Sequence, residues 1–133
     1  MNCETLKKIL LQGEDHIFKF IENFASIDTL AEEICAFANS EGGYIIIGAS
    51  GNGEITGLNK SDISRLNQWI FHATSQKIDK ITSVLTHELI CDNKWILLAH
   101  ILRGRQKPYA VNQTDVWVKN GAGKRKASSD EIS

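Results

Sequence analysis

Long apolar runs and targeting signals are missing from this sequence. No stretch approaches the roughly eighteen consecutive apolar residues that a membrane-spanning helix needs. The first residues, from Met1 to Glu4, lack the basic start and the apolar stretch of a signal peptide. Internal repeats and low-complexity segments are absent as well. We therefore expect no membrane segment, a cytoplasmic location, and one cooperative core in a single domain over residues 1–133.

Spacing typical of metal ligands is missing too. The cysteines lie far apart in sequence and form none of the close Cys and His pairs that zinc sites use; they are Cys3, Cys35 and Cys91. The histidines show no ligand spacing either; they are His16, His72, His87 and His100. We expect reduced thiols that are buried or incidental, and we assign no metal ion, no cofactor and no catalytic residue.

A strong net charge is the third absence. The formal net charge is −1, whereas nucleic-acid-binding domains usually carry a basic balance overall or locally. The average hides an asymmetry, because the stretch from His100 to Lys126 holds seven basic residues against one acid, Asp115. This stretch is locally +6, and the remainder is −7. The seven basic residues are Arg103, Arg105, Lys107, Lys119, Lys124, Arg125 and Lys126.

The first half of the chain alternates helical and strand patterns. Apolar spacing predicts a helix over residues 4–12 that Gly13 ends, and a β-rich run predicts a strand over residues 16–21. Asp28 is expected to cap the N-terminus of a strongly amphipathic helix that ends near residues 39–41. Four large apolar residues in a row over 44–47 then predict a central strand that is covered on both faces.

The second half continues this alternation. Residues 48–53 predict a glycine-rich tight turn and residues 54–57 a short strand, and Asn59 or Ser61 is expected to cap a long helix. Two strands over 83–90 and 94–101 are predicted to form a hairpin through residues 91–93, and Val116 and Trp117 mark another short strand. The last residues, 128–131, form a capping-box pattern that starts a helix. We therefore expect an N-terminal fragment of a longer chain, with a missing C-terminal region.

Several of these segments together resemble the Schlafen AlbA-type (AlbA_2) domain. The most specific is the run A-F-A-N-S-E-G-G that leads into I-I-I-G, within Glu33 to Gly48. The other matching segments are Glu14-Asp15, Phe20, Asp28 to Leu30, Gly53 to Leu58, Lys107-Pro108-Tyr109, Val116 to Gly121, Arg125 and Ala127-Ser128. The resemblance implies an α/β fold, α+β-like, with a central mixed sheet and about three helices, and a DNA-binding role in bacterial transcriptional regulators.

In the animal members, related domains cleave RNA with clustered carboxylates, and the resemblance places these near residues 14–20 and in the loop after the I-I-I-G strand. Here Glu14 keeps the first acid, but Lys19 stands in place of the second and Ile21 in place of the usual lysine. Residues 49–52 carry no aspartate. Metal-assisted hydrolysis needs several carboxylates, so we expect no nuclease activity.

Each candidate site has a structural alternative. Asn39 and Ser40 could offer polar groups to a ligand, but a helix exit explains them better. The loop over 48–53 lacks the lysine of a P-loop and is interpreted as a tight turn, with phosphate contact as the alternative. Core packing or an interface is expected for Trp69 and Trp95, whereas Trp117 lies between basic residues, where it could stack on a base.

Our leading hypothesis is a module that binds DNA or RNA through the phosphate backbone, using the seven basic residues in flexible loops. The alternative for these residues is a solvated basic face. The second hypothesis is a homodimer or protein-interaction domain that pairs through an exposed strand edge or a tryptophan-bearing helix. A metal-dependent endonuclease is the third, and the departures at Lys19 and Ile21 disfavour it.

Overall fold

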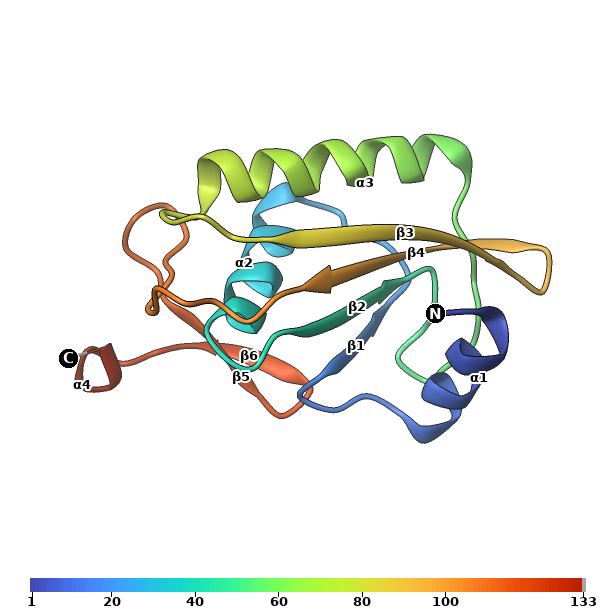
Figure 1. Ribbon diagram of the computed structural model, residues 1–133, viewed down its shortest axis with the longest axis horizontal. Helices are drawn as coiled ribbons and strands as arrows, with labels where there is room; N and C mark the ends of the chain where they lie inside the picture. The colour runs from blue at the N-terminus through green and yellow to red at the C-terminus, as the bar shows by residue number, and fades with distance from the viewer. Residues whose placement is uncertain (133) are drawn as a thin grey trace.

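The computed structural model describes residues 1–132 and has an α+β fold around a mixed sheet (Figure 1). Ser133, the last residue of the expected single domain, lies outside the described residues. The helices are α1 (Cys3–Gln12), α2 (Ile27–Ala38), α3 (Lys60–His72) and α4 (Ser129–Ile132), with a π-turn η1 (Ala73–Lys77) after α3. The strands are β1 (Phe18–Ile21), β2 (Gly43–Ile47), β3 (Val84–Cys91), β4 (Lys94–Ile101), β5 (Trp117–Asn120) and β6 (Gly123–Lys126).

The main sheet contains both parallel and antiparallel pairs, as expected. Its order is β1-β2-β4-β3; β1 and β2 run parallel, and the other neighbours run antiparallel. Strands β5 and β6 form a separate hairpin, which lies beside α2 and the start of β1 in Figure 1. Within residues 1–132, no helix is both long and apolar enough to cross a membrane.

Helices cover the two faces of the sheet unequally. On one face, Ile45 and Ile47 pack with side chains of α2 and α3 in the larger apolar core. On the other, Ile46 packs against Leu6 and Leu10 of the shorter α1. All three isoleucines of β2 are fully buried, which confirms the predicted central strand. Apolar burial of this kind supplies most of the driving force for folding.

Of two predicted helix N-caps, one is wrong and the other is confirmed. The N-cap of α2 is Ser26, not Asp28 as expected, because the Ser26 hydroxyl accepts the N–H of Thr29 at 3.1 Å. Asp28 falls in the first turn instead, where the helix dipole favours an acid, and it pairs with Lys77 at 2.8 Å. The prediction for α3 is confirmed at Asn59, which forms a capping box with Asp62.

Other local predictions were confirmed or corrected. Gly13 ends α1 with a φ of 95°, as expected for glycine. The segment 54–57 is not a strand, since only Ile55 forms a bridge, to Ala49. The preceding loop is a tight turn in which the Gly53 N–H donates to the Ser50 carbonyl at 2.9 Å, and the Ser50 N–H donates to the carbonyl of Glu54, just after the loop, at 2.8 Å.

The two outer cysteines contradict the expectation of reduced thiols. Cys3 of α1 and Cys91 at the end of β3 form a disulfide across 88 residues of sequence. Cys35 alone agrees with the expectation: it is free and fully buried, and burial raises the pKa of its thiol to about 11. Sequence spacing did not predict the pair because the fold, and not a local motif, brings α1 to the β3–β4 turn.

Asn39, at the end of α2, joins three segments that are distant in sequence. Its Nδ2 donates to the carbonyls of Tyr109 and Trp117, at 2.9 and 2.8 Å, and its Oδ1 accepts the N–H of Tyr109 at 2.7 Å. The structural interpretation of Asn39 is therefore confirmed, although its own backbone is right-handed and Gly42, with a φ of 77°, makes the turn.

We predict that Asn39→Asp lowers the free energy of unfolding by about 2–4 kcal/mol, because two backbone carbonyls lose their donor and face a carboxylate. Urea denaturation at neutral pH measures the change. Asn52→Asp, the same substitution on an exposed turn, is the matched control and should be nearly neutral. Equal stability of the two variants would contradict the role assigned to Asn39.

Candidate nucleic-acid interface

The seven basic residues singled out from the sequence fall into two groups. Arg103, Arg105 and Lys107 lie in the loop that follows β4. Lys119 lies on β5, and Lys124, Arg125 and Lys126 lie on β6. The second group was expected in flexible loops, but it belongs to a paired hairpin in which Lys119 is opposite Lys124. The two groups therefore have different structural settings.

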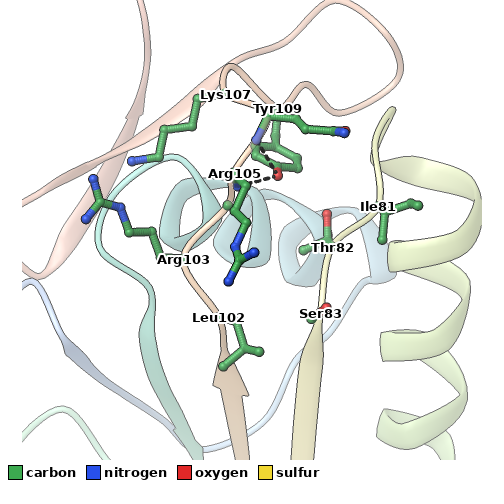
Figure 2. A pocket seen from close by; sticks show the side chains of 10 residues that line it. Ile81, Thr82, Ser83, Leu102, Arg103, Arg105, Lys107 and Tyr109 are labelled. Atoms are coloured by element: carbon green, nitrogen blue, oxygen red, sulfur yellow. Dashed lines mark hydrogen bonds between the residues drawn. The ribbon is translucent and has the colours of Figure 1, made fainter.

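The first group lines an open groove of about 1090 Å³ (Figure 2). One wall is the loop over residues 102–107, and the other is the segment over residues 81–83, which leads into β3. Figure 2 shows Arg103 and Lys107 on one side of the loop, while Arg105 points along the groove toward Leu102. The groove thus combines three cationic side chains with the apolar side chains of Ile81 and Leu102 and the hydroxyls of Thr82 and Ser83.

Tyr109 fixes the shape of this loop. The tyrosine is buried, and its hydroxyl accepts the backbone N–H groups of Arg105 and Gln106, at 3.0 and 3.1 Å. Gly104 is required just before them, because a Cβ at that position would overlap the Tyr109 ring. The guanidinium groups of Arg103 and Arg105 have no hydrogen-bond or ion-pair partner in the described chain, but the backbone that carries them is held by the buried Tyr109.

Further hydrogen bonds hold the loop from outside. Lys80 donates to the carbonyls of Gln106 and Pro108, at 2.9 and 2.7 Å. Lys107 donates to the carbonyl of Ser40 at 2.8 Å, so one of the three cations is already attached to the end of α2. Within residues 1–132, no carboxylate forms an ion pair with Arg103, Arg105 or Lys107.

Lys124, in the second group, neutralises a buried acid. Glu33 of α2 is 3% exposed, and one of its carboxylate oxygens lies 3.0 Å from the Lys124 ammonium. Glu32 lies at 3.9 Å from the same ammonium. The other oxygen of Glu33 is buried without a hydrogen-bond partner in the described chain. An acid in this setting depends on its lysine, because an unpaired buried charge is strongly unfavourable.

The remaining hairpin cations also have internal partners. Arg125 forms a two-pronged pair with Glu131 of α4, at 2.6 and 2.7 Å, which lowers the pKa of Glu131 to about 2. Lys126 lies 3.7 Å from Asp115. Lys119 lies over the Phe37 ring at 4.2 Å, and burial lowers the pKa of its ammonium. These side chains hold the hairpin and α4 in place.

The tryptophans do not form an open stacking surface. Trp69 and Trp95 pack against the larger core, as expected, and Arg65 lies 4.4 Å from the Trp69 ring centre. The ring of Trp117 has the ammonium groups of Lys124 and Lys126 at 5.6 and 5.7 Å from its centre. Its indole nitrogen is buried, so Trp117 is a half-buried packing residue.

The acids near β1 have structural contacts as well. The Glu14 carboxylate accepts the N–H of Phe20 at 2.9 Å, and Asp15 accepts the N–H groups of Ile17 and Phe18. In the described part of the chain, the one trio of potential metal ligands within 4.8 Å of one another is Cys3, Cys91 and Asp92. Two members of that trio share the disulfide.

Part of the groove could not be found from sequence. The residues Pro108 and Tyr109 predicted a closed loop, but nothing in the sequence of residues 81–83 indicates that they face it. Their position follows from the β3–β4 pairing, in which Leu102 donates to the Ser83 carbonyl at 3.0 Å.

Comparison with known proteins places this fold among described families. The family model described as Schlafen, AlbA_2 matches residues 14–128. The N-terminal domain of a Nitrosomonas europaea protein, named as an ATP-dependent DNA helicase RecG-related protein, has a TM-score of 0.68 at 18% identity. That match covers 98% of this chain and 92% of the other.

The DIP2311 protein from Corynebacterium diphtheriae has a TM-score of 0.63 at 22% identity, over 88% of this chain. This chain spans 26% of the length of that protein. At these sequence identities, both comparisons show similarity of fold alone. No curated protein matches the sequence.

We predict that Lys124→Met lowers the free energy of unfolding by about 3–5 kcal/mol, because it leaves Glu33 buried and unpaired. Lys126→Met, on the same strand, is the matched control and should cost less than about 1 kcal/mol, since its pair with Asp115 is exposed. Adding Glu33→Gln to Lys124→Met should recover part of the loss. Chemical denaturation of the variants measures these differences, and similar losses for both lysines would contradict the assignment.

Proposed function

The chain belongs to the Schlafen AlbA_2 family, and we propose that it is a nucleic-acid-binding module, with DNA the expected form, within a bacterial transcriptional regulator in the cytoplasm. The observation that carries this proposal is the groove beside β4. Arg103, Arg105 and Lys107 line it from a loop whose backbone is held by Tyr109, and none of the three has a carboxylate partner in the described chain. The name of the RecG-related neighbour connects that protein with DNA.

The groove suits a phosphodiester backbone on physical grounds. An arginine guanidinium can donate two parallel hydrogen bonds to a phosphate, and its charge remains at any physiological pH. The Ser83 hydroxyl adds a further donor on the opposite wall, whereas the Thr82 hydroxyl donates to the Lys80 carbonyl at 3.1 Å. Contacts of this kind give affinity without sequence selection, because the phosphates are the same at every step.

The hairpin cations have a lesser role in the proposal. Lys119, Lys124, Arg125 and Lys126 are each engaged inside the chain. Arg125 and Lys126 remain the more accessible of these, with side chains 46% and 59% exposed. They add long-range attraction for a polyanion, whereas direct phosphate contacts fall to Arg103, Arg105 and Lys107.

We further propose that the module binds without cleaving. The carboxylate of Glu14 is engaged with the backbone of β1, and Lys19 adds a positive charge where the resemblance calls for an acid. Hydrolysis assisted by a metal ion needs several convergent carboxylates. Cleavage of labelled DNA or RNA in Mg²⁺ or Mn²⁺, abolished by Glu14→Gln, would overturn this part of the proposal.

We predict that Arg103→Glu combined with Arg105→Glu lowers affinity for labelled nucleic acid at least tenfold at low salt. The slope of log affinity against log salt should flatten by about 2, because roughly one counterion is released per phosphate contact. Fluorescence anisotropy with double-stranded DNA, single-stranded DNA and RNA measures both effects and identifies the preferred form.

Lys8→Glu combined with Lys60→Glu is the matched control, since it changes the net charge equally at exposed positions outside the groove. We expect a change of less than threefold in affinity from this control. Equal losses from both pairs would assign binding to the overall charge and not to the groove. Absence of binding by the unaltered chain at low salt would overturn the proposed function.

A further inference from the structure

Strand β3 is an edge of the main sheet with its hydrogen-bonding groups open. Leu102 donates to the Ser83 carbonyl, and the register places Leu85 opposite His100. Since alternate residues of an antiparallel pair bond their neighbour, Leu85, His87 and Leu89 bond to β4. The N–H and C=O groups of Thr86, Glu88 and Ile90 therefore point outward, and within residues 1–132 nothing bonds to them.

The opposite edge of the sheet is closed by the chain itself. The outward N–H groups of β1 belong to Phe18 and Phe20, and they donate to the carboxylates of Asp15 and Glu14, both at 2.9 Å. The outward carbonyl of Phe18 accepts the N–H of Asp15 at 3.1 Å. One edge is thus blocked by side chains, while the other is left available.

The side chains of β3 do not protect its edge. The strand contains no proline and no lysine, the residues that commonly block pairing at an edge. It does carry apolar side chains exposed to solvent on both faces: Leu85 is 59% and Ile90 53% exposed. Helix α3 runs beside β3 in Figure 1, but it leaves Thr86, His87 and Glu88 exposed.

We propose that β3 pairs with β3 of a second copy of this chain, antiparallel and about a two-fold axis, to make one continuous eight-stranded sheet. The sequence of the strand favours this occupant because it is self-complementary. The proposal depends on the strand edge alone and is independent of nucleic-acid binding.

Two symmetric registers give the longest overlap, and they differ in the charges they oppose. With His87 on the axis, Leu85 faces Leu89 of the second copy, Val84 faces Ile90, and Thr86 faces Glu88. With Glu88 on the axis, two carboxylates face each other directly, which is destabilising. Both registers pair the outward-pointing residues with one another, as a hydrogen-bonded ladder requires, but the register centred on His87 keeps the two Glu88 carboxylates from directly opposing each other. It is therefore the favoured register.

The test uses a proline that removes one outward donor. The Thr86 N–H points away from β4, so Thr86→Pro should leave the β3–β4 ladder in place while blocking the second copy. Light scattering should give twice 14.8 kDa for the unaltered chain at high concentration and for the Thr86→Ala control. Thr86→Pro should give the monomer mass with an unchanged circular dichroism spectrum.

A second pair of variants tests the register and remains informative if the proline variant does not fold. His87→Cys places two thiols on the axis and should form a covalent dimer under mild oxidation, whereas Glu88→Cys should crosslink at least tenfold less. The reverse preference would overturn the register. A chain that stays monomeric at millimolar concentration, and that crosslinks at neither position, would overturn the proposal.

Discussion

The hydrogen bonds of the Asn39 side chain are the constraint on which the candidate interface depends. One amide connects the end of α2 to the backbone of Tyr109 and to that of Trp117. Tyr109 in turn holds the Arg105 loop, and Trp117 begins the β5–β6 hairpin. The groove loop and the hairpin have no regular pairing to the main sheet, and the Asn39 side chain connects both of them to α2, together with the contacts of Lys107 and Lys124. An asparagine suits this position because its amide offers a donor and an acceptor together.

The distribution of acids decides which cations remain available for a ligand. Lysines and arginines are close together in sequence from Arg103 to Lys126, yet Glu33, Asp115 and Glu131 lie only beside the hairpin. The basic residues therefore fall into two settings: the hairpin cations are engaged within the chain itself, and the groove cations have no carboxylate partner in the described residues. The modest net charge of the chain is consistent with this division, because attraction for a polyanion depends on local and not on average charge.

Sequence patterns predicted those parts of the fold whose cause is local. The helix ended by Gly13, the buried isoleucines of β2 and the β3–β4 hairpin each follow from neighbouring residues, and all were confirmed. Sequence patterns did not predict the features that depend on residues distant in sequence. Strand β6 was predicted to be a basic loop, because its partner acid, Glu33, lies on α2 and is distant in sequence. The Cys3–Cys91 disulfide depends on how α1 packs, and the groove wall over residues 81–83 depends on strand register. Seven basic residues could be named from the sequence, but not which three share a groove.

The acids at residues 14 and 15 illustrate how one substitution changes what a neighbouring residue can do. In a site with several carboxylates, Glu14 would be one ligand among others, but the family resemblance places Lys19 where a second acid would stand. The Glu14 carboxylate instead satisfies the Phe20 N–H, and Asp15 does the same for Phe18. An exposed strand edge invites pairing with other chains, so these two acids have a structural use that requires no ligand. Their presence in a familiar sequence motif is therefore explained by the backbone of β1 before any chemistry is invoked.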